Sequence, residues 1–155
     1  MKRAEVEAYL REHIPLSSGM AINVIDAGPD GVTIEAPLAP NVNHRGTAFG
    51  GSVAALAILT GWALVHLRLG AEGLVAHTVI QTSSVHYDAP IHGTFRAVTV
   101  PIEPSAWEKF TRTITRRGKG RVHISVNVLA EGCAAATFRG AYVALTDRRA
   151  PGTES

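Results

Sequence analysis

The chain of 155 residues is 46% hydrophobic and 18% charged, which is enough apolar material for one domain with its own core. This composition excludes disorder over the whole chain, and a formal net charge of +2 is too small to indicate nucleic-acid binding by itself. The start, MKRAEVEAYLREH, carries charges of both signs and lacks the apolar stretch of a signal peptide, so we expect a cytoplasmic protein with no membrane partner.

The first elements are predicted to be a helix and a hairpin. Apolar residues recur at helical spacing over residues 2–13, and Pro15 should end this helix. Strand-like stretches follow at residues 20–27 and 32–36. The sequence GPDG between them predicts the turn of a hairpin.

An almost continuously apolar segment, SVAALAILTGWALVHL, runs from residue 52 to residue 67. A helix that is apolar on every side must be surrounded by protein or by lipid. Its uninterrupted part, residues 53–65, is well short of the roughly 20 residues that cross a bilayer. We therefore interpret it as a core helix, in which Thr60 and His66 are satisfied polar groups.

The second half of the chain changes to the period-two alternation of strands. Four strands are predicted, at residues 75–87, 94–100, 121–130 and 134–145. Between the middle two, apolar residues at helical spacing indicate a short helix that Ser105 and Glu108 should begin with a capping box and Gly118 should end.

This order of elements predicts an α+β fold of the hot-dog type, in which an antiparallel sheet curls around the central apolar helix. We expect one domain over residues 1–145 and a flexible tail over residues 146–155. A sheet of this kind leaves a long strand at its edge. Two copies are therefore expected to pair into one continuous sheet, giving a homodimer or a dimer of dimers.

Neither cysteine nor metal chemistry is indicated. Cys133 is the only cysteine, so an internal disulfide is excluded, and its apolar surroundings suggest a small core residue. The histidines lack the spacing of a metal motif, so we expect no metal and no cofactor. Asp88, before Pro90, is interpreted as a turn residue.

The segment NVNHRGTAFGGSVAALA, residues 41–57, carries the clearest chemical signal. Glycines at its centre allow close backbone approach, and the first amides of a helix have no acceptor within the helix. Such amides, aided by the helix dipole, can stabilise an oxygen that becomes negative. The sequence therefore predicts an oxyanion hole at Gly50 and Gly51.

This segment, together with SSVHYDAP at residues 83–90, resembles the hot-dog thioesterase superfamily. The order of an asparagine, a glycine three residues on, and a later pair of glycines is met by Asn43, Gly46, Phe49, Gly50 and Gly51. NHRGTAFGGSVAALAILTGWALVHLRL is similar to the thioesterase-like domain that follows an acetyltransferase domain in some bacterial proteins. RRGKGRVHISVNVLAEG and FRGAYVAL extend the likeness over most of residues 20–145.

The resemblance implies a substrate with an acyl group in thioester linkage to coenzyme A or to acyl carrier protein, whose pantetheine arm enters as part of the substrate. Asn43 would orient the reacting group or the attacking water, and the amide of Gly51, with that of Gly50, would polarise the thioester carbonyl. Ser84 would contact the acyl carbonyl or position water in the partner's site. Phe49, Ser52 and Ser83 would line the substrate site, although an ordinary strand role for either serine stays open.

Because of two departures from the superfamily pattern, the sequence does not decide which reaction the protein catalyses. Relatives of the phenylacetyl-coenzyme A type carry histidine where Phe49 stands and a catalytic carboxylate where we place Ile58, and residues 41–71 contain no Asp or Glu. Hydrolysis needs a base, whereas decarboxylation of a malonyl thioester needs mainly stabilisation of an enolate. A thioesterase is the leading expectation, a malonyl-thioester decarboxylase is the runner-up, and a non-catalytic acyl-thioester binding protein is the third. A dehydratase fits less well, because it needs a histidine at position 49.

The basic run TRRGKGR is the expected docking site of the anionic carrier. Its cationic residues are Arg116, Arg117, Lys119 and Arg121. Coenzyme A offers phosphates and acyl carrier protein an acidic helix, either of which such a cluster can bind. The alternative is a solvated turn.

Overall fold

The computed structural model describes residues 1–147, so the predicted tail lies outside the described residues except for its first two positions. Six strands form one antiparallel sheet in the order β1-β2-β4-β5-β6-β3. The strands are β1 (Asn23–Gly28), β2 (Gly31–Ala36), β3 (His77–Tyr87), β4 (Phe95–Thr99), β5 (Lys119–Ala130) and β6 (Cys133–Leu145). The helices are α1 (Arg3–His13), α2 (Pro15–Gly19), the 3-10 helix η1 (Ala39–Asn41), α3 (Gly50–Ala71) and α4 (Pro104–Arg117).

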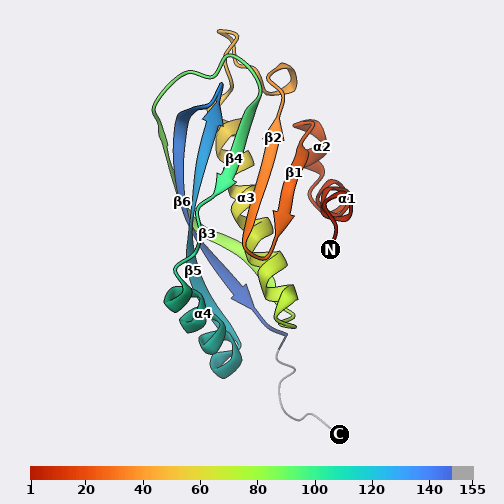
Figure 1. Cartoon of the computed structure of the whole chain (residues 1–155), viewed down its shortest axis with the longest axis vertical. Coiled ribbons are helices and arrows are strands. Elements are labelled where there is room, and N and C mark those ends of the chain that lie inside the picture. The colour runs from red at the N-terminus through yellow and green to blue at the C-terminus, as the bar shows by residue number, and fades with distance from the viewer. Residues whose placement is uncertain (148–155) are drawn as a thin grey trace, which may run out of the picture.

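The sheet curves around α3, with α1 and α2 beside β1 and α4 beside the start of β5 (Figure 1). The predicted α+β arrangement is therefore present. By length and composition α3 could cross a membrane, but it is the core helix of this sheet, and its buried residues run from Val53 to Leu69. Thr60 is fully buried and donates to the Leu56 carbonyl at 2.7 Å, which confirms the prediction of a satisfied core group.

His66 is half-buried on α3 and takes part in a stack of rings rather than in the apolar core. Its ring centroid lies 4.8 Å from that of Trp62 and 5.1 Å from that of Tyr9 on α1, and Tyr9 stacks in turn on His13. Burial, and secondarily the charge of His13, lower the pKa of His66. The stack joins α1 to α3.

Two local predictions need correction, and the prediction for Pro15 is confirmed but incomplete. Pro15 does end α1, but it also begins α2, because proline is well suited to the first turn of a helix. The capping box at Ser105 does not form, since α4 already begins at Pro104 and Ser105 lies inside the helix. Cys133 is exposed rather than buried, because it directly follows the β5–β6 turn, where Gly132 has a φ of +76°. Gly118 ends α4 as predicted, with a φ of +74°.

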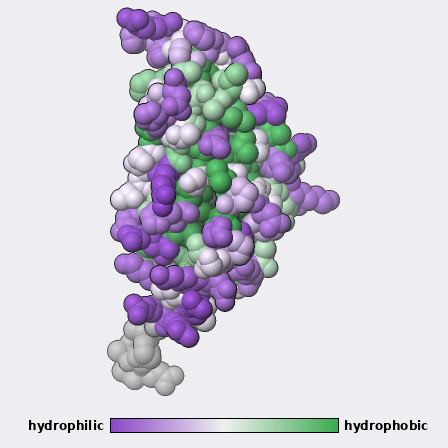
Figure 2. Space-filling view, turned by 60° about the vertical axis from the view of Figure 1, so that its left-hand side comes forward, coloured by the Kyte–Doolittle hydropathy of each residue, from purple (hydrophilic) through white to green (hydrophobic). Residues whose placement is uncertain are grey.

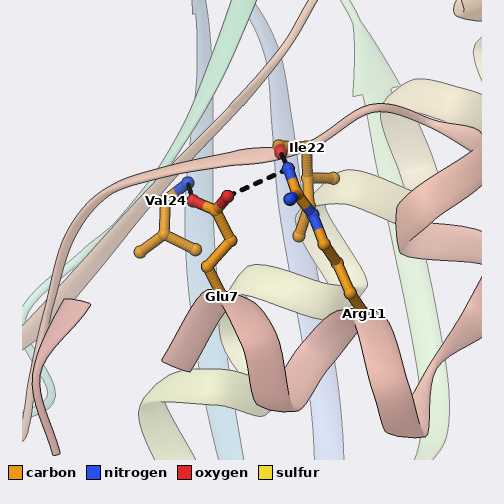
Figure 3. Close-up of polar contacts among 4 residues, drawn as sticks. All are labelled: Glu7, Arg11, Ile22 and Val24. Atoms are coloured by element: carbon orange, nitrogen blue, oxygen red, sulfur yellow. Dashed lines mark hydrogen bonds and ion pairs between the residues drawn. The ribbon is translucent and has the colours of Figure 1, made fainter. Parts of the chain in front are cut away.

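The two edge strands of the sheet differ in how their outer edges are covered. Along β1, the Glu7 carboxylate of α1 accepts from the Val24 amide at 2.9 Å, and Arg11 donates to the Ile22 carbonyl at 2.8 Å (Figure 3). Glu7 and Arg11 also form an ion pair at 2.9 Å. Side chains of α1 therefore occupy backbone groups that a further strand would use.

The other edge strand, β3, has eleven residues, and most of them are exposed. Val79 and Tyr87 each expose 53% of their surface. Figure 2 turns forward the side of the molecule on which β6 lies, and hydrophobic residues reach the surface in a band down its middle. Trp62 of α3 donates to the Thr78 carbonyl of β3 at 2.8 Å, but most of β3 stays exposed, which makes it the edge more open to pairing.

Candidate active site at the start of the central helix

Asn43 closes the loop that leads into α3. Its side-chain oxygen accepts from the amides of Arg45 at 2.8 Å and Thr47 at 3.1 Å, while its nitrogen donates to the Thr47 hydroxyl at 2.8 Å. A bridge between Val42 and Ala48 completes the loop. The residue predicted to act on substrate thus also holds the backbone that precedes the two glycines.

The first turn of α3 leaves two amides without an acceptor. The Phe49 carbonyl accepts from Ser52 at 2.9 Å and from Val53 at 3.1 Å, and Phe49 itself has the extended backbone of an N-cap. Within residues 1–147, the amides of Gly50 and Gly51 donate no hydrogen bond. This is the local geometry that an oxyanion hole requires, at the positive end of a 22-residue helix.

The Phe49 ring folds back over Gly51. A Cβ atom at Gly51 would lie 2.5 Å from the ring edge, so the ring could not occupy this place beside any larger residue. Phe49 remains 56% exposed and is not among the residues that line the cavity beside Gly50. The Phe49 ring cannot accept a proton. The histidine expected at this position from the phenylacetyl-coenzyme A type could accept one.

A cavity of about 310 Å³ opens beside Gly50. Its walls come from the loop before α3, the start of α3, the end of β3 and the start of β6, and its lining includes Ala48, Gly50, Val53, Tyr87, Asp88 and Ile91. Tyr87 lines the cavity with Gly50 and donates its hydroxyl hydrogen to the Gly50 carbonyl at 2.9 Å. Reasoning from sequence missed Tyr87, although its place in SSVHYDAP, an aromatic residue at the end of a polar strand, was a usable signal.

Asp88 is the carboxylate that lines this cavity. It lies 3.3 Å from the ring nitrogen of His86, and its amide donates to the Ala135 carbonyl, which supports its predicted turn role. No group of three metal-binding side chains occurs among the described residues. The cavity thus places the carboxylate of Asp88 and the backbone of Gly50 on its walls.

The two serines of β3 lie on opposite faces of the sheet. Ser84 pairs with the exposed Arg139 of β6, whereas Ser83 is two residues from Val85, which pairs with the buried Phe138. Ser83 thus shares the helix-facing side with Tyr87, and Ser84 points outward. Ser83 is four residues from Tyr87, about 13 Å along the strand, so one chain does not bring either serine to Gly50.

The basic residues lie at the other end of the molecule (Figure 1). Arg68 of α3 stacks on Trp107 of α4, and the rise of a helix places it about 27 Å from Gly50. The predicted docking residues lie at the end of α4 and the start of β5. One of them, Arg121, donates to Gln81 of β3 at 3.3 Å. Within one chain they are remote from the glycine amides.

An antiparallel sheet wrapped around a helix that begins beside a cavity defines a hot-dog fold of the thioesterase class. Comparison with known proteins confirms this assignment. The chain belongs to the family described as "Putative thioesterase (yiiD_Cterm)", whose model matches residues 3–146.

Solved structures of several bacterial proteins share the fold. A protein of unknown function from Chlorobaculum tepidum is 25% identical with a TM-score of 0.88, and 94% of each chain is covered. A protein of Shewanella oneidensis described as a "putative thioesterase" is 26% identical with a TM-score of 0.81, covering 92% of this chain and 96% of that one. A thioesterase of Haemophilus influenzae, at 15% identity and a TM-score of 0.74 over 94% and 92% of the two chains, shows the fold alone.

Proposed function

We propose that this protein hydrolyses an acyl thioester carried by coenzyme A or by acyl carrier protein, with the amides of Gly51 and Gly50 as the oxyanion hole. The observation that supports this most directly is the pair of amides without acceptors at the start of α3, whose first residue, Gly50, lines a cavity. When water attacks the thioester carbonyl, its oxygen becomes negative, and each well-aimed donor contributes on the order of 10²–10³ in rate.

Hydrolysis also needs a group that takes the proton of the attacking water. Residues 41–71 offer no carboxylate, so Asp88 is the acceptor that the cavity provides, with His86 beside it. Asn43 would position the thioester or water through the loop that it closes. Phe49 and Ser52 would contact the acyl group at the start of α3.

Decarboxylation of a malonyl thioester is the second candidate. In that reaction the bond to the carboxylate carbon breaks, carbon dioxide leaves, and the electron pair forms an enolate that then takes a proton. The same two amides would stabilise the enolate oxygen, and no base is required. The absence of acidic residues from the start of α3 and the ring of Phe49 favour this alternative, while a silent thioester-binding protein remains the third.

We propose a cytoplasmic homodimer, alone or as half of a dimer of dimers, that forms by antiparallel pairing of β3 with its copy. Such pairing would bring the His77 end of one strand beside the partner's Tyr87 end, next to the partner's Gly50. His77 and Lys119 both pair with Leu145, so the basic end of one chain would lie near the site of the other. Arg116, Arg117, Lys119 and Arg121 could then dock the carrier while its acyl group reaches the partner's amides, with Ser83 or Ser84 nearby.

Product analysis tests the proposal. The purified protein is incubated with acetyl-, hexanoyl- and malonyl-coenzyme A and with malonyl-acyl carrier protein, and both thiol and carbon dioxide are measured. Release of thiol supports hydrolysis, and release of carbon dioxide with the thioester retained supports decarboxylation. Neither product with any substrate would contradict both enzymatic readings.

Replacing Asn43 with Ala should lower either activity at least about 10²-fold, because the loop before the oxyanion donors loses three hydrogen bonds of 3.1 Å or less. Asn43→Asp keeps the two bonds that the side-chain oxygen accepts and should retain more activity. Full activity in the Ala variant, with the fold checked by circular dichroism, would reject this assignment.

A further inference from the structure

We infer that Tyr87 is a positioning residue of this site, whose hydroxyl fixes and polarises the peptide unit that carries the Gly51 amide. The inference rests on the proposed function, because it concerns how the oxyanion donor is aimed. Tyr87 donates to the Gly50 carbonyl at 2.9 Å, and a Cβ atom at Gly50 would lie 3.5 Å from its ring.

The Gly50 carbonyl and the Gly51 amide belong to one peptide unit. This unit is planar and trans, so its C=O and N–H point in opposite directions. A hydrogen bond that fixes the carbonyl therefore also fixes the direction of the amide. It also draws electron density toward the oxygen, and such coupling strengthens the opposite donor by about 10–30%.

The sequence around this peptide gives such an anchor a role. Two successive glycines give the backbone more freedom than any other pair of residues, and neither of their amides is held by a hydrogen bond within the described residues. Tyr87 belongs to β3 and pairs with Ala136 of β6, so its position is set by the sheet. The sheet thus orients the first peptide of α3.

A second tyrosine makes the same kind of bond elsewhere on α3. Tyr142 is buried in β6 and donates to the Ile58 carbonyl at 2.6 Å. That carbonyl lies more than two turns inside the helix and away from the glycines, so its tyrosine supports packing alone. The pair offers a matched comparison between a positioning bond and a structural one.

The experiment compares Tyr87→Phe with Tyr142→Phe in the full chain. Turnover is measured with whichever thioester of the panel the wild type processes, and the Gly51 amide is followed by ¹H–¹⁵N NMR without ligand. We expect Tyr87→Phe to lower kcat about tenfold with KM changed less than twofold, and to shift the Gly51 amide proton to lower frequency. Its thermal midpoint should stay near that of the wild type, because Tyr87 is exposed.

Tyr142→Phe should show the reverse pattern. Loss of a buried hydrogen bond should lower the thermal midpoint by roughly 2–4 °C, with kcat and the Gly51 resonance unchanged. An unchanged Gly51 resonance in Tyr87→Phe, or a loss of stability without a change in kcat, would overturn the inference. If the wild type processes no thioester, the proposed function fails, and the NMR comparison still decides whether Tyr87 orients this peptide.

Discussion

At the scale of single residues, the site depends on which backbone groups lack partners. Three side chains contact the stretch that leads into α3. Asn43 shapes the loop, the Phe49 ring covers Gly51, and Tyr87 donates to the Gly50 carbonyl. Backbone donors cannot be removed by ordinary side-chain substitution. The start of a helix offers an exception, because proline is accepted there.

Replacing Gly50 with Pro removes the Gly50 amide hydrogen and should lower kcat about 10²-fold if this amide serves the oxyanion. The change suits the backbone, because Phe49 before it is extended and Gly50 is the first helical residue. Gly50→Ala is the control, since its Cβ would lie at an ordinary 3.5 Å from Tyr87 and the amide remains. Equal kcat in the two variants would leave Gly51 as the sole donor.

At the scale of elements, α1 is attached to the domain in two ways. Its charged side chains bond to β1, and its Tyr9 and His13 extend a ring stack that includes Trp62 and His66 of α3. The stack joins two imidazoles, so it is sensitive to protonation.

Because folding lowers the pKa of His66, the unfolded chain binds more protons at this residue near and below pH 6.5. The free energy of unfolding should therefore decrease as the pH falls below about 6.5, the unfolded pKa, and should level off below the folded pKa. His66→Phe keeps a ring in the stack and should weaken this dependence, as measured by urea unfolding between pH 5 and 8. The same change at the exposed His44, to Phe, is the control, and an unaltered pH profile in His66→Phe would contradict the prediction.

At the scale of the whole molecule, the two edges of the sheet determine how copies can associate. Side chains of α1 occupy β1, whereas β3 is exposed along most of its length. An assembly that uses only one edge closes as a dimer, while two open edges would allow growth.

Replacing both Glu7 and Arg11 with Ala should expose the β1 edge, lower the free energy of unfolding by about 2 kcal/mol and produce species larger than those of the wild type. Sedimentation velocity over a range of protein concentrations measures the size of these species. The control is Glu108→Ala with Arg112→Ala, which removes an ion pair of the same spacing on α4. Identical sedimentation of the Glu7/Arg11 variant and the wild type would show that α1 does not protect this edge.

Periodicity and local chemistry were sufficient to predict the three longer helices and the six strands, because the core helix is apolar on nearly every side and the strands alternate, but they missed the short helices α2 and η1. They also led to the prediction of a chemical site at the glycine pair that begins α3, since amides at a helix start lack acceptors whatever the surroundings. Only the tertiary structure could decide that Tyr87 of β3 reaches Gly50, that Ser83 and Ser84 face opposite ways, and that Cys133 lies at a turn. Such contacts depend on strand register and on the packing of residues distant along the chain, which no local pattern contains.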